Sequence, residues 1–216
     1  MSDVLDQVQI FMKKGKSKDV QALVQQALDE GIEASVILDE GLLAAMNEIG
    51  IRFKAGEAFV PEVLVAARAM NKGLEILKPH LAEGGIEEKG VAILGTVKGD
   101  LHDIGKNLVK IMVEGKGINV IDLGVDVSEE KFVEAVNEYH PQLVMMSALL
   151  TTTMPEMKVV IKALEEAGLR DQVRVMVGGA PVTESYCAEI GADKYTEDAT
   201  GASEEALKLL EEMKEK

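Results

Sequence analysis

A short stretch near the middle of the chain, Gly99–Gly105, brings two carboxylates and an imidazole close together. It follows the apolar run Val91–Leu94 and precedes a run in which Leu108 and Met112 recur at helical spacing, which predicts a strand, a tight loop and a helix. His102 is therefore carried at the carboxyl end of a strand, where ligands bind in open α/β sheets. Its neutral imidazole is a good metal ligand, although a histidine without partners is more often an ordinary loop residue.

Strands and helices alternate along the chain after residue 90. This alternation predicts a parallel sheet covered by helices on both faces, and five strands suit the flavodoxin-like order of a Rossmann-like domain. The predicted strands are Val91–Leu94, Ile118–Leu123, Leu143–Ser147, Val173–Val177 and Lys194–Thr196. The predicted helices are Ile104–Glu114, Glu129–Tyr139, Pro155–Ala167, Glu184–Ile190 and Ser203–Met213.

The first part of the chain shows helical periodicity only. Its apolar stripes predict an N-terminal four-helix bundle, because no single amphipathic helix can bury its apolar face alone. We expect the second helix to have Ser17 as its N-cap. The fourth is expected to start near Pro61, to end at Pro79 and to carry Leu64 inward.

A polar, glycine-rich connection separates the two patterns, around Gly84–Gly85 and Glu87–Gly90. We place the domain boundary there, which gives a helical cap domain over residues 1–84 and a Rossmann-like domain over residues 90–216. The connection is long enough to act as a hinge.

Composition argues against several classes of protein. The formal net charge of -15 disfavours binding to nucleic acid or to anionic lipid. No apolar stretch approaches the roughly 20 residues that cross a membrane, and the N-terminus lacks the features of a signal peptide. The single cysteine, Cys187, rules out an intramolecular disulfide. We therefore expect a cytoplasmic protein that binds neither nucleic acid nor membrane.

Four short motifs occur in the order and at the places typical of one family. They are Asp100-x-His102-x-x-Gly105 after the first predicted strand, Ser147-Ala-Leu149 at the end of the third, Gly178-Gly179 at the end of the fourth, and Phe53–Pro61 in the helical part. The first resembles the signature of B12-dependent proteins that bind cobalamin through a histidine, and the next two resemble that family's Ser-x-Leu and Gly-Gly. Gly95–Asp100 and Asp122–Val125 also resemble the cobalamin-binding region of methionine synthase, and the helical motif resembles its cap. With these two domains alone, the chain is similar to the corrinoid proteins of methanogens and acetogens.

The resemblance implies that cobalamin, methylcobalamin or a related corrinoid binds in the base-off/His-on mode, with His102 as the lower axial ligand of cobalt. A ligating histidine usually donates its other N–H to a carboxylate, and this role is implied for Asp100. A serine hydroxyl of the family aligns with Thr153, whose extra methyl leaves the geometry open. Thr151 or Thr152 is the alternative.

Other residues are implied at the cofactor by the same resemblance. The family's nucleotide tail enters a slot that favours small residues near the ligand. The implied residues are Asp103 and Ile104 beside the histidine, Gly105, Ser147, Gly178 and Gly179 along the slot, Leu149 as its apolar wall, and Phe53 and Val60 over the methyl group. Phe53 equally fits simple packing inside the bundle.

The implied function is carriage of a methyl group, not an enzymatic activity of the chain on its own. The implied partners are a substrate-specific methyltransferase, a corrinoid:acceptor methyltransferase that uses coenzyme M or tetrahydrofolate, and a reductive activase. Two alternatives share similar modules. A B12-dependent sensor adds a DNA-binding domain, and no helix-turn-helix precedes the cap here. The small subunit of an adenosylcobalamin mutase shares the histidine loop but generally lacks the helical cap.

Overall fold

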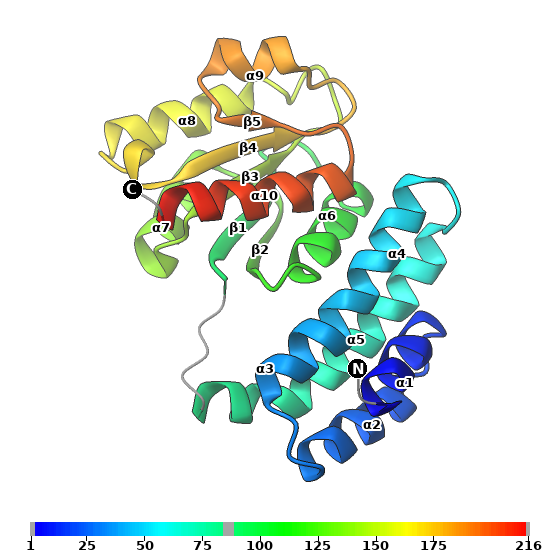
Figure 1. The fold of residues 1–216 in the computed structure, drawn as a ribbon. Helices are drawn as coiled ribbons and strands as arrows, with labels where there is room; N and C mark the ends of the chain where they lie inside the picture. Colours follow the sequence, from blue (N-terminus) through cyan, green and yellow to red (C-terminus); the bar gives the residue numbers. More distant parts are fainter. Residues whose placement is uncertain (1–2, 84–88, 215–216) are drawn as a thin grey trace. The chain divides into compact units, whose positions relative to one another are not determined.

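The computed structural model describes residues 3–83 and 89–214, which belong to two compact units (Figure 1). The first unit is Met1–Glu87 and the second is Glu88–Lys216. The connection that the sequence predicts around Gly84–Gly85 and Glu87–Glu88 lies outside the described residues. Within the described ranges, no helix is both long and apolar enough to cross a lipid bilayer.

The first unit consists of helices packed around one apolar interior. Because α3, the π-helical segment η1 and α4 follow one another without a break, they form one helical run, and residues 3–83 contain four such runs. Buried side chains from different runs meet in the interior, among them Val8, Val24, Met46 and Met70. The elements are α1 (Asp3–Lys13), α2 (Ser17–Asp29), α3 (Ala34–Val36), η1 (Ile37–Leu43), α4 (Ala44–Lys54) and α5 (Val60–Glu83).

Three local expectations for this unit are wrong. Ser17 is the first residue of α2, and the N-cap residue is Lys16, whose side chain makes no capping hydrogen bond. Leu64 is 46% exposed, and the adjacent Val63 is the buried residue at this point of α5. Pro79 lies inside α5 and does not end it. Pro79 has no backbone N–H to donate to the carbonyl of Glu75, and Glu75 is an exposed residue.

The second unit is a five-stranded parallel sheet with the order β2-β1-β3-β4-β5, which confirms the flavodoxin-like topology. The long β1 and β2 extend further toward their carboxyl ends than their apolar runs predict. The strands are β1 (Val91–Val97), β2 (Asn119–Val127), β3 (Leu143–Ser147), β4 (Arg174–Gly178) and β5 (Lys194–Tyr195).

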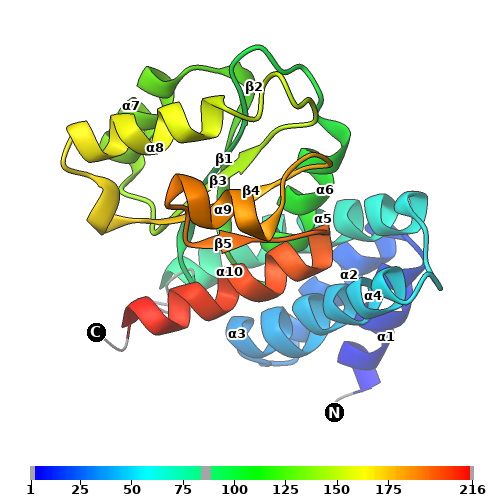
Figure 2. The ribbon, with the colours of Figure 1, turned by 90° about the horizontal axis from the view of Figure 1, so that it is seen from above.

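Helices cover both faces of this sheet, as Figures 1 and 2 show. Alternate strand residues point to opposite faces, so Leu94 packs with residues of α6 and α10 while Ile93 packs with residues of α7, α8 and α9. The helices are α6 (Ile104–Glu114), α7 (Glu129–Tyr139), α8 (Glu156–Glu166), α9 (Glu184–Ile190) and α10 (Ala199–Lys214).

The strand order reverses between β1 and β3. The chain leaves β1 toward α6 on one face and leaves β3 toward α8 on the other face. This is the topological switch point, where ligands bind in folds of this type. The two loops that begin here, after β1 and after β3, carry Asp100 and His102 on one side and Leu149 and Thr153 on the other.

Candidate functional site

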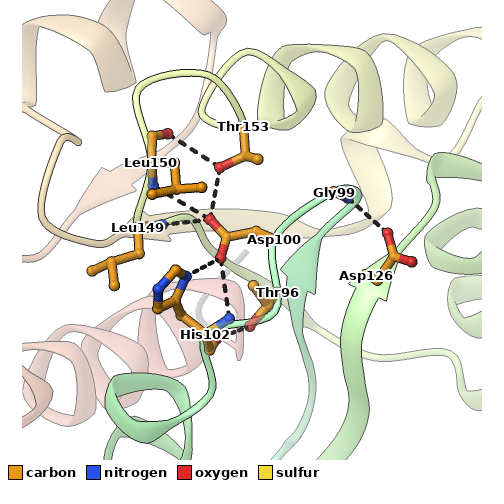
Figure 3. Close-up of polar contacts among 8 residues, drawn as sticks. All are labelled: Thr96, Gly99, Asp100, His102, Asp126, Leu149, Leu150 and Thr153. Carbon is orange, nitrogen blue, oxygen red and sulfur yellow. Dashed lines mark hydrogen bonds and ion pairs between the residues drawn. The ribbon is translucent and has the colours of Figure 1, made fainter.

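The loop after β1 carries His102 and is held by hydrogen bonds to neighbouring elements (Figure 3). It turns at Gly99, whose positive φ of 78° favours glycine. The backbone N–H of Gly99 donates to the Asp126 carboxylate at 2.7 Å. The hydroxyl of the buried Thr96, on β1, donates to the backbone carbonyl of His102 at 2.9 Å. The backbone position of His102 is thereby fixed before any ligand binds.

Asp100 is the hub of the site, since its fully buried carboxylate accepts hydrogen bonds from both loops. Oδ1 accepts from the backbone N–H of His102 at 3.1 Å and lies 2.7 Å from its Nδ1. Oδ2 accepts from the backbone N–H of Leu149 at 2.8 Å and of Leu150 at 3.4 Å, and from the hydroxyl of Thr153 at 2.6 Å. One carboxylate therefore joins the loop after β1 to the loop after β3.

The protonation state of this carboxylate determines the tautomer of the histidine. Burial opposes ionisation of Asp100, but hydrogen bonds from Thr153, Leu149 and His102 outweigh burial and hold the pKa of Asp100 well below its usual range. An ionised carboxylate only accepts hydrogen bonds, so Nδ1 of His102 is the donor, and the lone pair of a neutral imidazole in this orientation is on Nε2. The His102 side chain is 51% exposed. Within the described part of the chain, nothing hydrogen-bonds to Nε2.

Thr153, and neither of its two predicted alternatives, makes the third link. Its side chain is buried and faces Asp100, whereas Thr151 and Thr152 are exposed. No hydrogen bond from either of them to Asp100 occurs among the described residues. The extra methyl group of threonine is accommodated, since Thr153 still donates over a short distance.

The surface beside the imidazole is apolar. Leu101 and Ile104 flank His102 in the sequence, and the side chain of Leu149 lies next to the ring in Figure 3. All three are exposed, as is Leu150. A half-exposed nitrogen ligand beside exposed apolar side chains fits a flat, largely apolar macrocycle that carries a metal ion, and such a group of exposed apolar residues is typical of a binding surface.

The small residues predicted along the slot lie at the carboxyl edge of the sheet. The strand register pairs Thr96 with Ser147 and Ser147 with Gly178, so these three lie side by side across β1, β3 and β4. A Cβ on Gly178 would be 3.2 Å from the carbonyl oxygen of Thr196, and a Cβ on Gly105 would meet nothing within 4 Å. The glycine at 105 therefore has no packing requirement inside the described part of the protein.

The structure gives a reason for glycine at position 179 that the sequence did not reveal. Its φ is 127°, and a Cβ there would lie 1.8 Å from the carbonyl oxygen of Ala148. Only glycine allows the turn after β4 to pass this close to the loop after β3. The predicted role of Gly179 in lining the slot for the nucleotide tail stays a prediction.

Gly179→Ala is expected to lower the free energy of unfolding by about 2–3 kcal/mol, because the backbone of one of the two loops must move. Urea denaturation of the protein at neutral pH measures this. Gly168→Ala is the matched control, since Gly168 also has a positive φ (70°) but open space around it. Its expected cost is about 1 kcal/mol. Equal losses in the two variants would refute the close contact as the reason for Gly179.

The remaining predicted residues lie apart from the hydrogen-bond network of Asp100. Asp103 is the N-cap residue of α6, and its carboxylate accepts from the side chain of Asn107 at 3.2 Å. Phe53 and Val60 belong to the helical unit, where Phe53 is half-buried near the end of α4 and Val60 is the exposed first residue of α5.

Comparisons with known proteins show the family to which the chain belongs. The B12 binding domain family matches residues 90–207, and a second B12 binding domain family matches residues 4–78. The dimethylamine corrinoid protein of Methanosarcina barkeri is 46% identical over 196 residues, which are 90% of this chain and 92% of that protein. A trimethylamine corrinoid protein of Methanosarcina acetivorans is 45% identical over 180 residues, 82% of this chain and 83% of that one.

A solved structure is similar over nearly the whole chain. It is the methanol:cobalamin methyltransferase complex MtaBC from Methanosarcina barkeri, with a TM-score of 0.88 and 29% identity over 98% of this chain and 81% of that chain. The two domain matches and the relatives show that the chain binds a corrinoid. The chain belongs to the family of B12-binding corrinoid proteins of methyltransferase systems.

Proposed function

We propose that the protein carries a methyl group on a corrinoid bound in the base-off/His-on mode, with His102 as the lower axial ligand of cobalt. The observation that carries this proposal is the half-exposed imidazole, whose Nδ1 is held by a buried, ionised Asp100. This leaves Nε2 as the nitrogen that faces a ligand. A carboxylate on the other ring nitrogen fixes the tautomer and raises the basicity of a ligating histidine.

The corrinoid supplies the cobalt that accepts and gives up the methyl group, while the chain supplies ligation and orientation. Asp100 orients the imidazole, and Thr153 with the backbone N–H groups of the loop after β3 keeps Asp100 ionised and in place. Ile104 and Leu149 offer apolar contact to the macrocycle.

The displaced nucleotide tail is assigned to the slot at the carboxyl edge of the sheet. Gly105, whose missing side chain leaves open space, allows the ligand to approach the backbone, and Ser147 and Gly178 lie side by side at the same edge. The helical domain over residues 1–84 is assigned the cap over the methyl-bearing face, with Phe53 and Val60 toward it. The domain over residues 90–216 holds the corrinoid.

A methylated amine is the proposed methyl donor. Relatives named as dimethylamine and trimethylamine corrinoid proteins share 46% and 45% identity with this chain, against 29% for the chain of the methanol complex. A substrate-specific methyltransferase would load the corrinoid, and a second methyltransferase would pass the methyl group to coenzyme M or tetrahydrofolate. A reductive activase would return inactive cobalt to the reduced state.

Reconstitution of the complete system tests the proposal. The chain is loaded with cobalamin, reduced, and mixed with a dimethylamine-specific methyltransferase and a thiol-specific acceptor methyltransferase. We expect dimethylamine to be consumed and methylated thiol to form only when all three proteins are present. The same assay is repeated with a trimethylamine-specific and with a methanol-specific methyltransferase, and transfer with the methanol-specific protein alone would contradict the amine donor. Transfer at an unchanged rate without the chain would contradict the carrier role itself.

A further inference from the structure

A buried lysine begins the helix that follows the histidine loop. Lys106 is the third residue of α6, and its side chain is only 2% exposed. A cation in the first turn of a helix opposes the helix dipole, and a buried charge is costly unless it is paired. A buried lysine at the start of a helix therefore needs a counter-charge, and its position next to the histidine loop suggests a function.

The partner is Asp122 on β2. Nζ of Lys106 lies 2.5 Å from Oδ1 of Asp122 and also donates to the side-chain oxygen of Asn107 at 3.1 Å. The Asp122 carboxylate accepts a further bond from the backbone N–H of Gly124 at 3.0 Å. Burial opposes the ionisation of Asp122, but its bonds to Lys106 and Gly124 outweigh burial and lower its pKa. The pair is therefore an ion pair at neutral pH.

The same part of β2 also holds the opposite end of the histidine loop. The register between β1 and β2 shifts around Gly95, so β2 is irregular after Asp122, with a φ of 89° at Gly124 and 54° at Asp126. Asp126 accepts the N–H of Gly99 with its carboxylate, and its own N–H donates to the carbonyl of Asp100 at 3.0 Å. The segment from Asp122 to Asp126 thus contacts the chain on both sides of His102, at Gly99 and Asp100 before it and at Lys106 after it.

We propose that Lys106 and Asp122 are positioning residues, which fix the start of α6 and, together with Asp126, clamp the histidine loop so that the imidazole faces the corrinoid. This inference rests on the ligand role proposed for His102. The proposal also explains the motif Asp122–Val125, whose residues make no hydrogen bond to Asp100 among the described contacts. Asp126 secures the first half of the loop, and the ion pair secures the second half.

The test uses the full chain without corrinoid and three variants. Lys106→Met removes the ion pair at similar side-chain length. Lys106→Met combined with Asp122→Asn also removes the carboxylate that the first change leaves unpaired. Lys110→Met is the matched control, since Lys110 lies on the same helix, 3.7 Å from Asp122, with a side chain that is 31% exposed. Hydrogen exchange of the backbone over residues 99–105 and the urea midpoint are measured for each protein.

We expect Lys106→Met to speed hydrogen exchange in this loop by at least about tenfold, and Lys110→Met to leave it within about twofold of the unchanged protein. The double variant should regain the urea midpoint but not the loop protection, a split that a merely structural role would not produce. Loop exchange at the original rate in Lys106→Met or in the double variant would overturn the proposal.

The corrinoid-loaded proteins give a second readout that separates this inference from the proposed function. With cobalt(II), Lys106→Met should show a smaller fraction of electron paramagnetic resonance signal split by the histidine nitrogen. If the unchanged protein shows no such splitting, the ligand role of His102 fails. If splitting is present and equal in Lys106→Met and the unchanged protein, the clamp fails and the ligand role stands.

Discussion

His102→Ala is expected to weaken corrinoid retention about 10–100-fold and to abolish the splitting of the cobalt(II) spectrum by the histidine nitrogen. Alanine has no side-chain nitrogen, so the cobalt loses its ligand from the protein, while the apolar side chains that contact the corrinoid remain. Gel filtration after reconstitution measures retention as the ratio of corrinoid to protein, and electron paramagnetic resonance measures the splitting.

The matched control for this change is His80→Ala. His80 is an exposed residue of α5 in the helical unit. It should leave both retention and splitting unchanged. Retention and a cobalt(II) spectrum of His102→Ala that both match the unchanged protein would show that His102 is not the ligand.

Asp100→Asn is expected to lower the free energy of unfolding at pH 7 by about 3–5 kcal/mol. The side-chain oxygen of asparagine can still accept from His102. Its NH2 group, however, would replace the oxygen that accepts from the backbone N–H groups of Leu149 and Leu150, so these buried donors would lose their acceptor. Urea denaturation of the protein without corrinoid measures the loss. Asp171→Asn, at an exposed position, should change stability little.

The effect of Asp100→Asn also depends on pH in a defined direction. Folding lowers the pKa of Asp100, so its ionised form stabilises the folded protein above the usual pKa of a carboxyl, and this contribution is lost as the pH falls toward the lowered value. The difference between the unchanged protein and the variant should be largest near neutral pH and shrink below about pH 4. A difference that stays constant from pH 7 to below pH 4 would contradict the lowered pKa.

The order of the strands was predictable because it depends on features that a linear pattern contains. Five apolar runs separated by helices imply a parallel sheet, and five strands suit the flavodoxin-like order. The hydrogen bond of Asp100 to His102 was predictable as well, since the two residues are two positions apart on one tight loop.

Contacts between segments that are distant in the chain were harder to predict from the sequence. The choice of Thr153 over Thr151 depends on how the loop after β3 turns, and three adjacent threonines look alike in a pattern. The ion pair of Lys106 with Asp122 joins two elements across 16 positions of the chain, and the positive φ of Asp126 occurs at a residue that is not glycine, so neither has a signal in the sequence. The close contact of Gly179 with Ala148 likewise exists only once β3 and β4 are paired.

The measurement that most directly tests the account is electron paramagnetic resonance of the cobalt(II) form, prepared with protein labelled with ¹⁵N in histidine. Ligation by His102 predicts that the nitrogen splitting of each cobalt line changes from a triplet in unlabelled protein to a doublet in labelled protein. A triplet that persists after labelling would show that the corrinoid's own base remains on the cobalt. Either that triplet or the absence of any nitrogen splitting would contradict the central claim.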